Sequence, residues 1–141
     1  MNLKEIVFEE GSRLKKIGPK SFNRSGIERI VIPRGVEEIQ ESTFSWCTNL
    51  KEVVFEEGNG LKTIGESVFS DCSNLAKINL PDGLVNVDDW TFCDCKNLKN
   101  IRLPSGLEKI GVACFYGSGL EEVILPASVK EVCADTFRDC K

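Results

Sequence analysis

The sequence contains no histidine, and this absence limits the chemistry that the chain can perform. Histidine is the commonest general base and the commonest metal ligand in proteins, because its pKa lies close to neutral pH. Glycine-rich phosphate loops and nucleophile elbows are missing as well. One acidic pair, Asp88-Asp89, precedes Trp90, but an aspartate at the start of a turn is more typical of a cap. We therefore expect no enzyme, and we assign no catalytic residue and no cofactor.

Long apolar runs and an excess of basic charge are also missing. No stretch is long enough to span a membrane, and Met1 leads directly into the repeated pattern without a signal peptide. The 18 basic and 22 acidic residues are mixed along the chain and give a net charge of −4. Binders of nucleic acid or of membrane surfaces need a basic face, so neither class is expected. Two compartments are compatible with the sequence. We expect the chain at the cell surface or secreted if it is a segment of a longer protein with a signal peptide, and in the cytoplasm otherwise.

Cysteine is present in an odd number, seven, but not in the spacing of a metal site. A zinc site needs Cys-x2-Cys pairs or histidine partners, and the sequence offers neither, so we assign no metal. A disulfide framework is not expected either. Four cysteines recur at one position of a repeat, where free cysteine usually serves as a small buried residue; they are Cys47, Cys72, Cys95 and Cys140. Cys93 lies off this position, and we expect it to face outward and to react first.

The chain consists of six copies of one unit, best seen in Leu98–Gly119, LKNIRLPSGLEKIGVACFYGSG. The units begin near residues 3, 27, 50, 75, 98 and 120. Five apolar columns recur in each unit, and a sixth column is phenylalanine in every copy: Phe22, Phe44, Phe69, Phe92, Phe115 and Phe137. One unit of this length cannot bury its own apolar face, whereas stacked units bury a shared one. The sequence therefore predicts a single repeat domain over residues 1–141.

The spacing within a unit predicts its local structure. Apolar and polar residues alternate before each proline, which indicates a short strand, and the strands of successive units should pair in parallel. A second short extended segment carries the fourth and fifth columns. The small residue three positions after each phenylalanine suggests a short helical turn. Glycine or asparagine before the next unit would then end that turn in the left-handed conformation; these residues are Gly26, Asn49, Asn74, Asn97 and Gly119.

Strings such as IGESVFSDCSNLAKINLP resemble the BspA-like class of leucine-rich repeats, whose pattern is LxxIxLPxxLxxIGxxAFxxCxxL. The resemblance covers essentially the whole chain. It implies a right-handed, curved leucine-rich-repeat solenoid with parallel short strands, and a role in protein binding or adhesion, often at microbial surfaces. It implies no catalytic residue, because the motif positions are core positions. The chain departs from the motif glycine at Gln40, Asp88 and Cys133, and small or β-branched residues replace the motif alanine.

Strand parity identifies a candidate protein-binding surface. Residues between the core columns of the first strand should face outward, and one outward column contains Val7, Val31 and Val54. The valines favour an apolar stripe for a protein partner, although strand propensity alone also favours valine. The candidate residues are Arg29, Val31, Glu52, Val54, Asn79, Arg102 and Ile124.

Three further features are open at this stage. Trp46, Trp90 and Tyr116 lie off the core columns and are either binding residues or covers for neighbouring repeats. Two acidic insertions, at 9–13 and 56–60, suit a solvated edge better than a site for a cation or a basic partner. The first and last units have no polar capping unit, so we expect end-to-end self-association. The function expected is thus a protein-binding scaffold within a BspA-like surface protein; the alternative is a synthetic or trimmed array that only self-associates.

Overall fold

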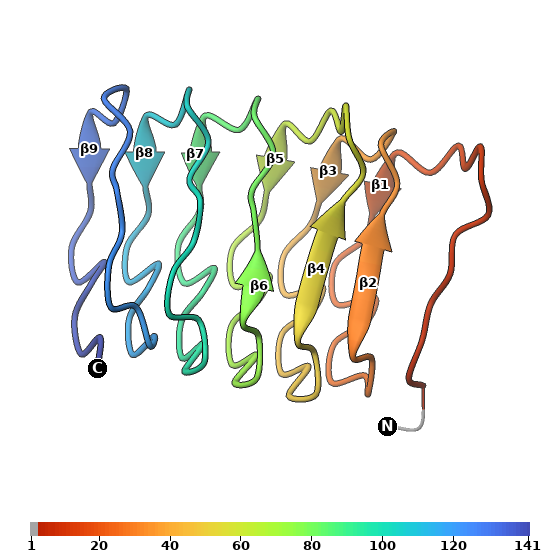
Figure 1. Cartoon of the computed structure of the whole chain (residues 1–141), viewed down its shortest axis with the longest axis horizontal. Helices are drawn as coiled ribbons and strands as arrows, with labels where there is room; N and C mark the ends of the chain where they lie inside the picture. The colour runs from red at the N-terminus through yellow and green to blue at the C-terminus, as the bar shows by residue number, and fades with distance from the viewer. Residues whose placement is uncertain (1–2) are drawn as a thin grey trace.

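The outer strands of the repeats form a parallel sheet at the front of the molecule (Figure 1). The computed structural model describes residues 3–141. Strands β2 (Arg29–Ile32), β4 (Glu52–Phe55) and β6 (Lys77–Ile78) pair in the order β2-β4-β6, with core residue Ile30 beside Val53 and Val53 beside Ile78. Single bridges from Glu5 to Arg29 and from Asn79 to Arg102 extend this arrangement on both sides. We call these strands and bridged segments the front sheet.

The second extended segment of each repeat forms a back row, also parallel. Its first part contains β1 (Lys16–Ile17), β3 (Glu38–Ile39) and β5 (Thr63–Ile64), and its second part contains β7 (Asn86–Val87), β8 (Lys109–Ile110) and β9 (Glu131–Val132). Equivalent residues of successive repeats pair, so the apolar column continues from repeat to repeat. The predicted parallel-strand solenoid is confirmed, with the two termini at opposite ends of its long axis (Figure 1).

The front sheet is well formed only in the second to fourth repeats, since the first repeat joins it through the Glu5 bridge alone within the described residues. β2 and β4 pair over four residues, whereas the fifth repeat contributes one bridge at Arg102 and the sixth contributes no strand. The outward valines of β2 and β4 favour strands, but the β-branched Val7 and Ile124 stand in segments without a strand, so the strand propensity of the outward residues does not by itself determine where the front sheet forms.

The predicted helical turn around each phenylalanine is wrong, because residues 3–141 contain no helix. That stretch accordingly has no helix able to cross a membrane. Each segment is a chain of tight turns, as in the first repeat, where Ser21, Asn23 and Ser25 donate backbone hydrogen bonds to the carbonyls three residues earlier. The i, i+3 spacing that suggested a helix is shared by successive turns.

Residues in the left-handed conformation bend these turns, and they are not the ones expected. They lie two positions before and two positions after each phenylalanine; in the second repeat they are Ser42 (φ 55°) and Trp46 (φ 61°). Glycine and asparagine before the next unit have other roles. A side chain at Gly119 would collide with the carbonyl of Lys96, and the Asn74 side chain donates to the Thr48 carbonyl at 2.7 Å.

Alternate amides of the turn segment bond to the next repeat. Lys20, Phe22 and Arg24 donate to the carbonyls of Glu41, Thr43 and Ser45 at 3.0 Å, and later repeats follow the same rule. We call this set of bonds the turn ladder. It satisfies backbone groups that a buried segment could not leave unpaired. It also holds successive turns at the spacing of sheet strands, which sets the spacing of the side chains inside.

The phenylalanine column forms a continuous stack beneath the turn ladder. The six rings lie nearly parallel, with neighbouring centroids 5.3–5.7 Å apart. Phe44, Phe69, Phe92 and Phe115 are completely buried. Beside them, the cysteine column donates to phenylalanine carbonyls of the preceding repeat, as Cys47 does to Phe22 at 3.1 Å. The core is therefore a set of columns that run along the solenoid axis.

Candidate binding face

The predicted outward column lies on the front sheet, and the structure brings its members together in register. Val31 of β2 pairs with Val54 of β4, and Arg29 pairs with Glu52 beside them. The Arg29 Nε atom lies 2.9 Å from Glu52 Oε1 at the start of the strands. Further along the face, Asn79 and Arg102 pair through their single bridge, and Ile124 is 77% exposed. All seven candidates thus share one surface.

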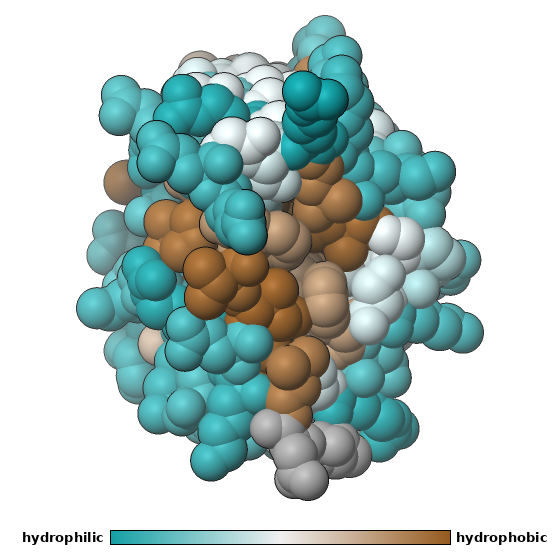
Figure 2. Space-filling view, turned by 90° about the vertical axis from the view of Figure 1, so that its right-hand side faces the viewer, coloured by the Kyte–Doolittle hydropathy of each residue, from teal (hydrophilic) through white to brown (hydrophobic). Residues whose placement is uncertain are grey.

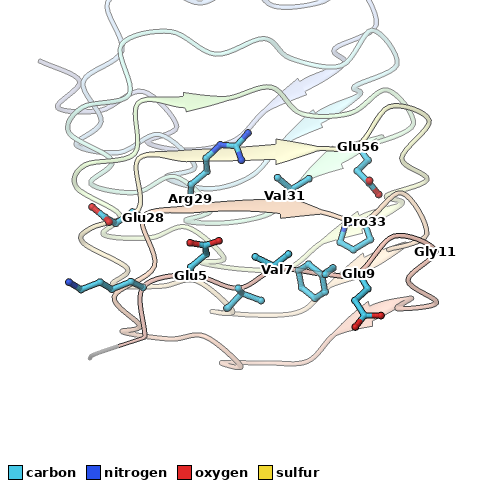
Figure 3. A pocket seen from close by; sticks show the side chains of 12 residues that line it. Glu5, Val7, Glu9, Gly11, Glu28, Arg29, Val31, Pro33 and Glu56 are labelled. Atoms are coloured by element: carbon cyan, nitrogen blue, oxygen red, sulfur yellow. The ribbon is translucent and has the colours of Figure 1, made fainter.

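A hollow of about 560 Å³ opens on this surface between the first two repeats (Figure 3). Its apolar lining includes Val7, Val31 and Pro33 from neighbouring segments. Val7 is 76% exposed, because the first segment joins the front sheet through only one bridge. Position 7 belonged to the predicted outward column, but the hollow itself has no signature in the sequence.

The two ends of this hollow differ in charge. At the start of the strands, Glu5, Glu28 and Arg29 lie together, whereas Glu9 and Glu56 flank Pro33 at the other end (Figure 3). Both glutamates open the acidic insertions noted in the sequence. Glycines at positive φ, Gly11 (80°) and Gly58 (77°), turn these insertions back, and Glu56 accepts the backbone N–H of Arg34 at 2.8 Å. The hollow therefore has a mixed-charge end, an apolar centre and an acidic end.

Two further hollows follow along the same face. One, of about 360 Å³, is lined by Glu52, Val54 and Asn79 among others. The other, of about 930 Å³, is wide and shallow and contains Asn79, Arg102 and Ile124. It lies where the front sheet is poorly paired, and the Arg102 Nη2 atom lies 3.8 Å from Asp82 Oδ2 there. We call the surface that contains the three hollows the front face.

The aromatic residues off the core columns lie elsewhere, on the turn segments. The Arg24 guanidinium stacks 5.2 Å from the Trp46 ring centroid, and the Trp90 and Tyr116 rings lie 6.2 Å apart. Trp46 and Trp90 remain 45% and 39% exposed. Each aromatic ring thus lies against a side chain of a neighbouring repeat. A hydrogen bond and the negative charge of Asp139 raise the pKa of Tyr116.

Two other residues singled out in the sequence have structural roles. Asp89 accepts the backbone N–H of Val112 at 2.7 Å and so caps the turn of the next repeat. Cys93 does not face outward as expected, because only 6% of it is exposed. Burial and the neighbouring carboxylate of Asp94 raise its pKa to about 12. Cys133 and Cys140, in the last repeat, are the more accessible thiols.

Comparison with known proteins identifies the repeat. The family described as BspA type Leucine rich repeat region matches residues 15–141 in six copies. The chain belongs to this family. The BspA-type repeat is a non-enzymatic scaffold fold that serves protein interaction. No similar sequence was found among curated proteins.

Solved leucine-rich repeat structures are similar to this BspA-type chain. One, from Bacteroides ovatus ATCC 8483, is 31% identical with a TM-score of 0.83, over 92% of this chain and 33% of that one. A leucine-rich repeat protein of T. pallidum is 35% identical with a TM-score of 0.76, over 80% of this chain and 55% of that one. A leucine-rich cell surface protein of Faecalibacterium prausnitzii A2-165 is 26% identical with a TM-score of 0.66, over 95% of this chain and 43% of that one. The chain thus spans between a third and just over half of each of these proteins.

Proposed function

We propose that the chain is a protein-binding scaffold and that its front face is the binding surface. The observation that carries this proposal is the row of three hollows on one face, where the outward column contributes apolar Val31, Val54 and Ile124 with polar Asn79 and Arg102 between them, and charged side chains lie along the border. Protein interfaces combine an apolar centre with a polar rim in this way. The paired strands β2 and β4 supply a rigid base, so little order would have to be gained on binding.

The first hollow indicates the chemistry of the partner. We propose that an extended segment binds there, with an apolar side chain over Val7 and Val31 and a lysine or arginine between Glu9 and Glu56. A basic side chain complements the two carboxylates, and the aliphatic part of that side chain would cover Pro33. The sequence alone favoured a solvated edge at the acidic insertions over a site for a basic partner. The carboxylates that flank the first hollow are the reason to propose the basic partner.

We also propose that the chain acts at a cell surface, as part of an adhesion protein. The support is the similarity to the Faecalibacterium prausnitzii protein, whose description calls it a cell surface protein. The chain covers 43% of that protein.

A peptide library displayed on phage and selected on the folded chain tests the binding surface. Selected peptides should be enriched in lysine or arginine next to an apolar residue. The double variant Val31→Lys, Val54→Lys should weaken their binding at least about 30-fold, because central interface residues contribute about 2 kcal/mol or more. The matched control is Val85→Lys, since Val85 is 43% exposed and adjoins the back row. Equal affinity of the selected peptides for the folded double variant would refute the proposal.

A further inference from the structure

The turn segments carry the two tryptophans of the sequence, Trp46 and Trp90, which lie outside the front face. These segments form the lower edge of the molecule in Figure 1, below the strands of the front sheet. The apolar patch in Figure 2 lies elsewhere, at the end of the molecule beside the first repeat. Trp46 is 45% exposed and Trp90 is 39% exposed. They belong to the second and the fourth repeat, so each tryptophan has a neighbouring repeat on both sides.

The backbone holds both tryptophans in a conformation that suits a large side chain poorly. Trp46 has φ 61° and Trp90 has φ 59°, in the left-handed region. A bulky residue rarely adopts this region, and such positions concentrate where a side chain has a function. The repeat does not require tryptophan there, because Asp71 and Ser67 occupy the equivalent positions of the third repeat with φ 61° and 59°. The fold alone therefore does not account for the two tryptophans.

Each tryptophan ring lies against one side chain of a neighbouring repeat. The Arg24 guanidinium is 5.2 Å from the Trp46 ring centroid, and the Tyr116 ring is tilted by 51° against Trp90. Beneath them, the phenylalanine rings of the second, third and fourth repeats are spaced by 5.4 and 5.5 Å, so the two tryptophans are offset by about 11 Å along the axis. Two aromatic surfaces are thus positioned in advance of any ligand, which lowers the cost of binding.

The surface between the two tryptophans is polar. Ser67 and Asp71 of the third repeat lie there, and both are partly exposed. Ser70 donates to Asp71 Oδ2 at 2.8 Å, and within residues 3–141 no group donates to Oδ1. Val68 and Cys72, the apolar residues of this stretch, are completely buried. The gap therefore lacks the apolar centre of a protein interface.

We propose that this surface, which we call the turn face and define by Trp46, Ser67, Asp71 and Trp90, binds a neutral glycan strand along the solenoid axis. A sugar ring has C–H groups on its faces, which stack on aromatic rings, and hydroxyl groups at its edge, which donate hydrogen bonds. One sugar stacks on Trp46 and another on Trp90, and their offset matches the length of a disaccharide. Hydroxyls between them donate to Asp71 Oδ1 and bond to Ser67.

The charges around the turn face favour a neutral glycan over an anionic one. Asp94 follows Asp71 in the same column, and Glu66 precedes Ser67, so carboxylates border the polar gap. Hydroxyl donors complement these carboxylates, whereas a uronic or sulfated sugar would meet like charge. The basic side chain beside the site, Arg24, is stacked on Trp46.

Intrinsic fluorescence tests the proposal directly, because Trp46 and Trp90 are the two tryptophans of the chain. Cellotetraose, chitotetraose and mannotetraose are titrated separately into the folded chain. At least one should give a saturable change in emission, and the absence of such a change with all three overturns the proposal. Tetragalacturonate is the anionic comparison and should bind at least about 10-fold more weakly. Equal or tighter binding of tetragalacturonate overturns the assignment to neutral glycans.

Two variants use residues that the third repeat already carries. Trp46→Asp and Trp90→Ser should preserve the turns, because Asp71 and Ser67 adopt the same backbone conformation. Each variant should weaken binding of the tetrasaccharide at least about 10-fold, measured by isothermal titration calorimetry, since tryptophan commonly dominates a contact surface. Unchanged affinity in either variant, with an unchanged circular dichroism spectrum, overturns a site that spans both rings.

Hydrogen–deuterium exchange of the wild type with the tetrasaccharide needs no variant to fold. Residues 40–47 and 88–95 should be protected, and residues 28–34 of the front face should be unchanged. Protection of 28–34 without the turn segments overturns the proposal. The double variant Val31→Lys, Val54→Lys should bind the tetrasaccharide like the wild type, and both tryptophan variants should bind selected peptides like the wild type. Failure of glycan binding is thereby distinguishable from failure of peptide binding.

Discussion

At the scale of single residues, close approach between repeats decides which side chains are tolerated. The motif glycine position alternates along the chain between glycine and a larger residue. A Cβ atom at Gly111 would lie 2.6 Å from the backbone nitrogen of Asp89, and one at Gly65 would lie 2.7 Å from that of Glu41. In both places the glycine packs against the backbone of a preceding repeat that carries a larger residue, Asp88 or Gln40, at its own motif position.

Gly111→Ala should lower the free energy of unfolding by about 1–3 kcal/mol, the usual cost of inserting a methyl group into a packed site. The neighbouring backbone atoms cannot move without disturbing the preceding repeat. Gly106→Ala is the matched control, because a Cβ atom there meets nothing within 4 Å. Urea denaturation of both variants measures the difference. Equal stability of the two variants would show that the close approach is not a constraint.

Thiol reactivity is a second residue-scale prediction. Burial raises the pKa of Cys72 and Cys95 well above the ordinary value, and that of Cys93 to about 12. At pH 8 these thiols are protonated and shielded, so Cys133 and Cys140 should react first with a thiol reagent. Unfolded thiols ionise near pH 9, so the stabilising contribution of buried neutral thiols is complete below that pH. It is lost as the pH rises from about 9 towards 12.

Mass spectrometry after brief alkylation of the native chain identifies the first modified residues. Labelling of Cys93 before Cys133 would contradict the structure. Denaturation midpoints at pH 7.5 and pH 10.5 measure the pH effect, with Cys93→Ala as the control that should show a smaller difference between the two pH values.

At the scale of elements, the back-row strands and the front strands of the second to fourth repeats were predictable from the sequence. The front strands expected in the first, fifth and sixth repeats form at most a single bridge, and the turn segments were not predictable. The alternation before each proline and the column of Ile17, Ile39 and Ile64 determine strand and register together, because a shift by one residue would expose the core column. The turn segments carry an i, i+3 pattern that a helix and successive turns share. The hydrogen bonds of the turn ladder to the next repeat decide between a helix and successive turns. No local sequence pattern encodes these bonds.

The phenylalanine stack provides a prediction for this scale. Phe92→Ala should cost about 3–5 kcal/mol, because the ring is fully buried between Phe69 and Phe115 and leaves a cavity inside the column. Phe22→Ala should cost clearly less, because that ring is stacked on one side only and is partly exposed. Chemical denaturation of both variants compares them. A larger loss in the free energy of unfolding for Phe22→Ala than for Phe92→Ala would contradict the account, in which the interior repeats contribute most of the stability.

At the scale of the whole molecule, each repeat contacts only its neighbours, so one surface can be altered without disturbing the rest. The sequence identified the front face by parity, since Val31, Val54 and Ile124 fall between core positions. It did not reveal the hollows, which depend on how far each segment separates from its neighbour. The acidic end of the first hollow depends on Glu9 and Glu56, which lie in different repeats and flank Pro33 only when the solenoid stacks.

The central claim is that partners bind on the front face. Hydrogen–deuterium exchange of the chain with and without a library-selected peptide tests it most directly. Protection should appear in residues 28–34 and 51–57, which contain β2, β4 and the glutamate beside Pro33, and the turn segments at 40–47 and 88–95 should be unchanged. Protection confined to the turn segments, with no change over β2 and β4, would contradict the account.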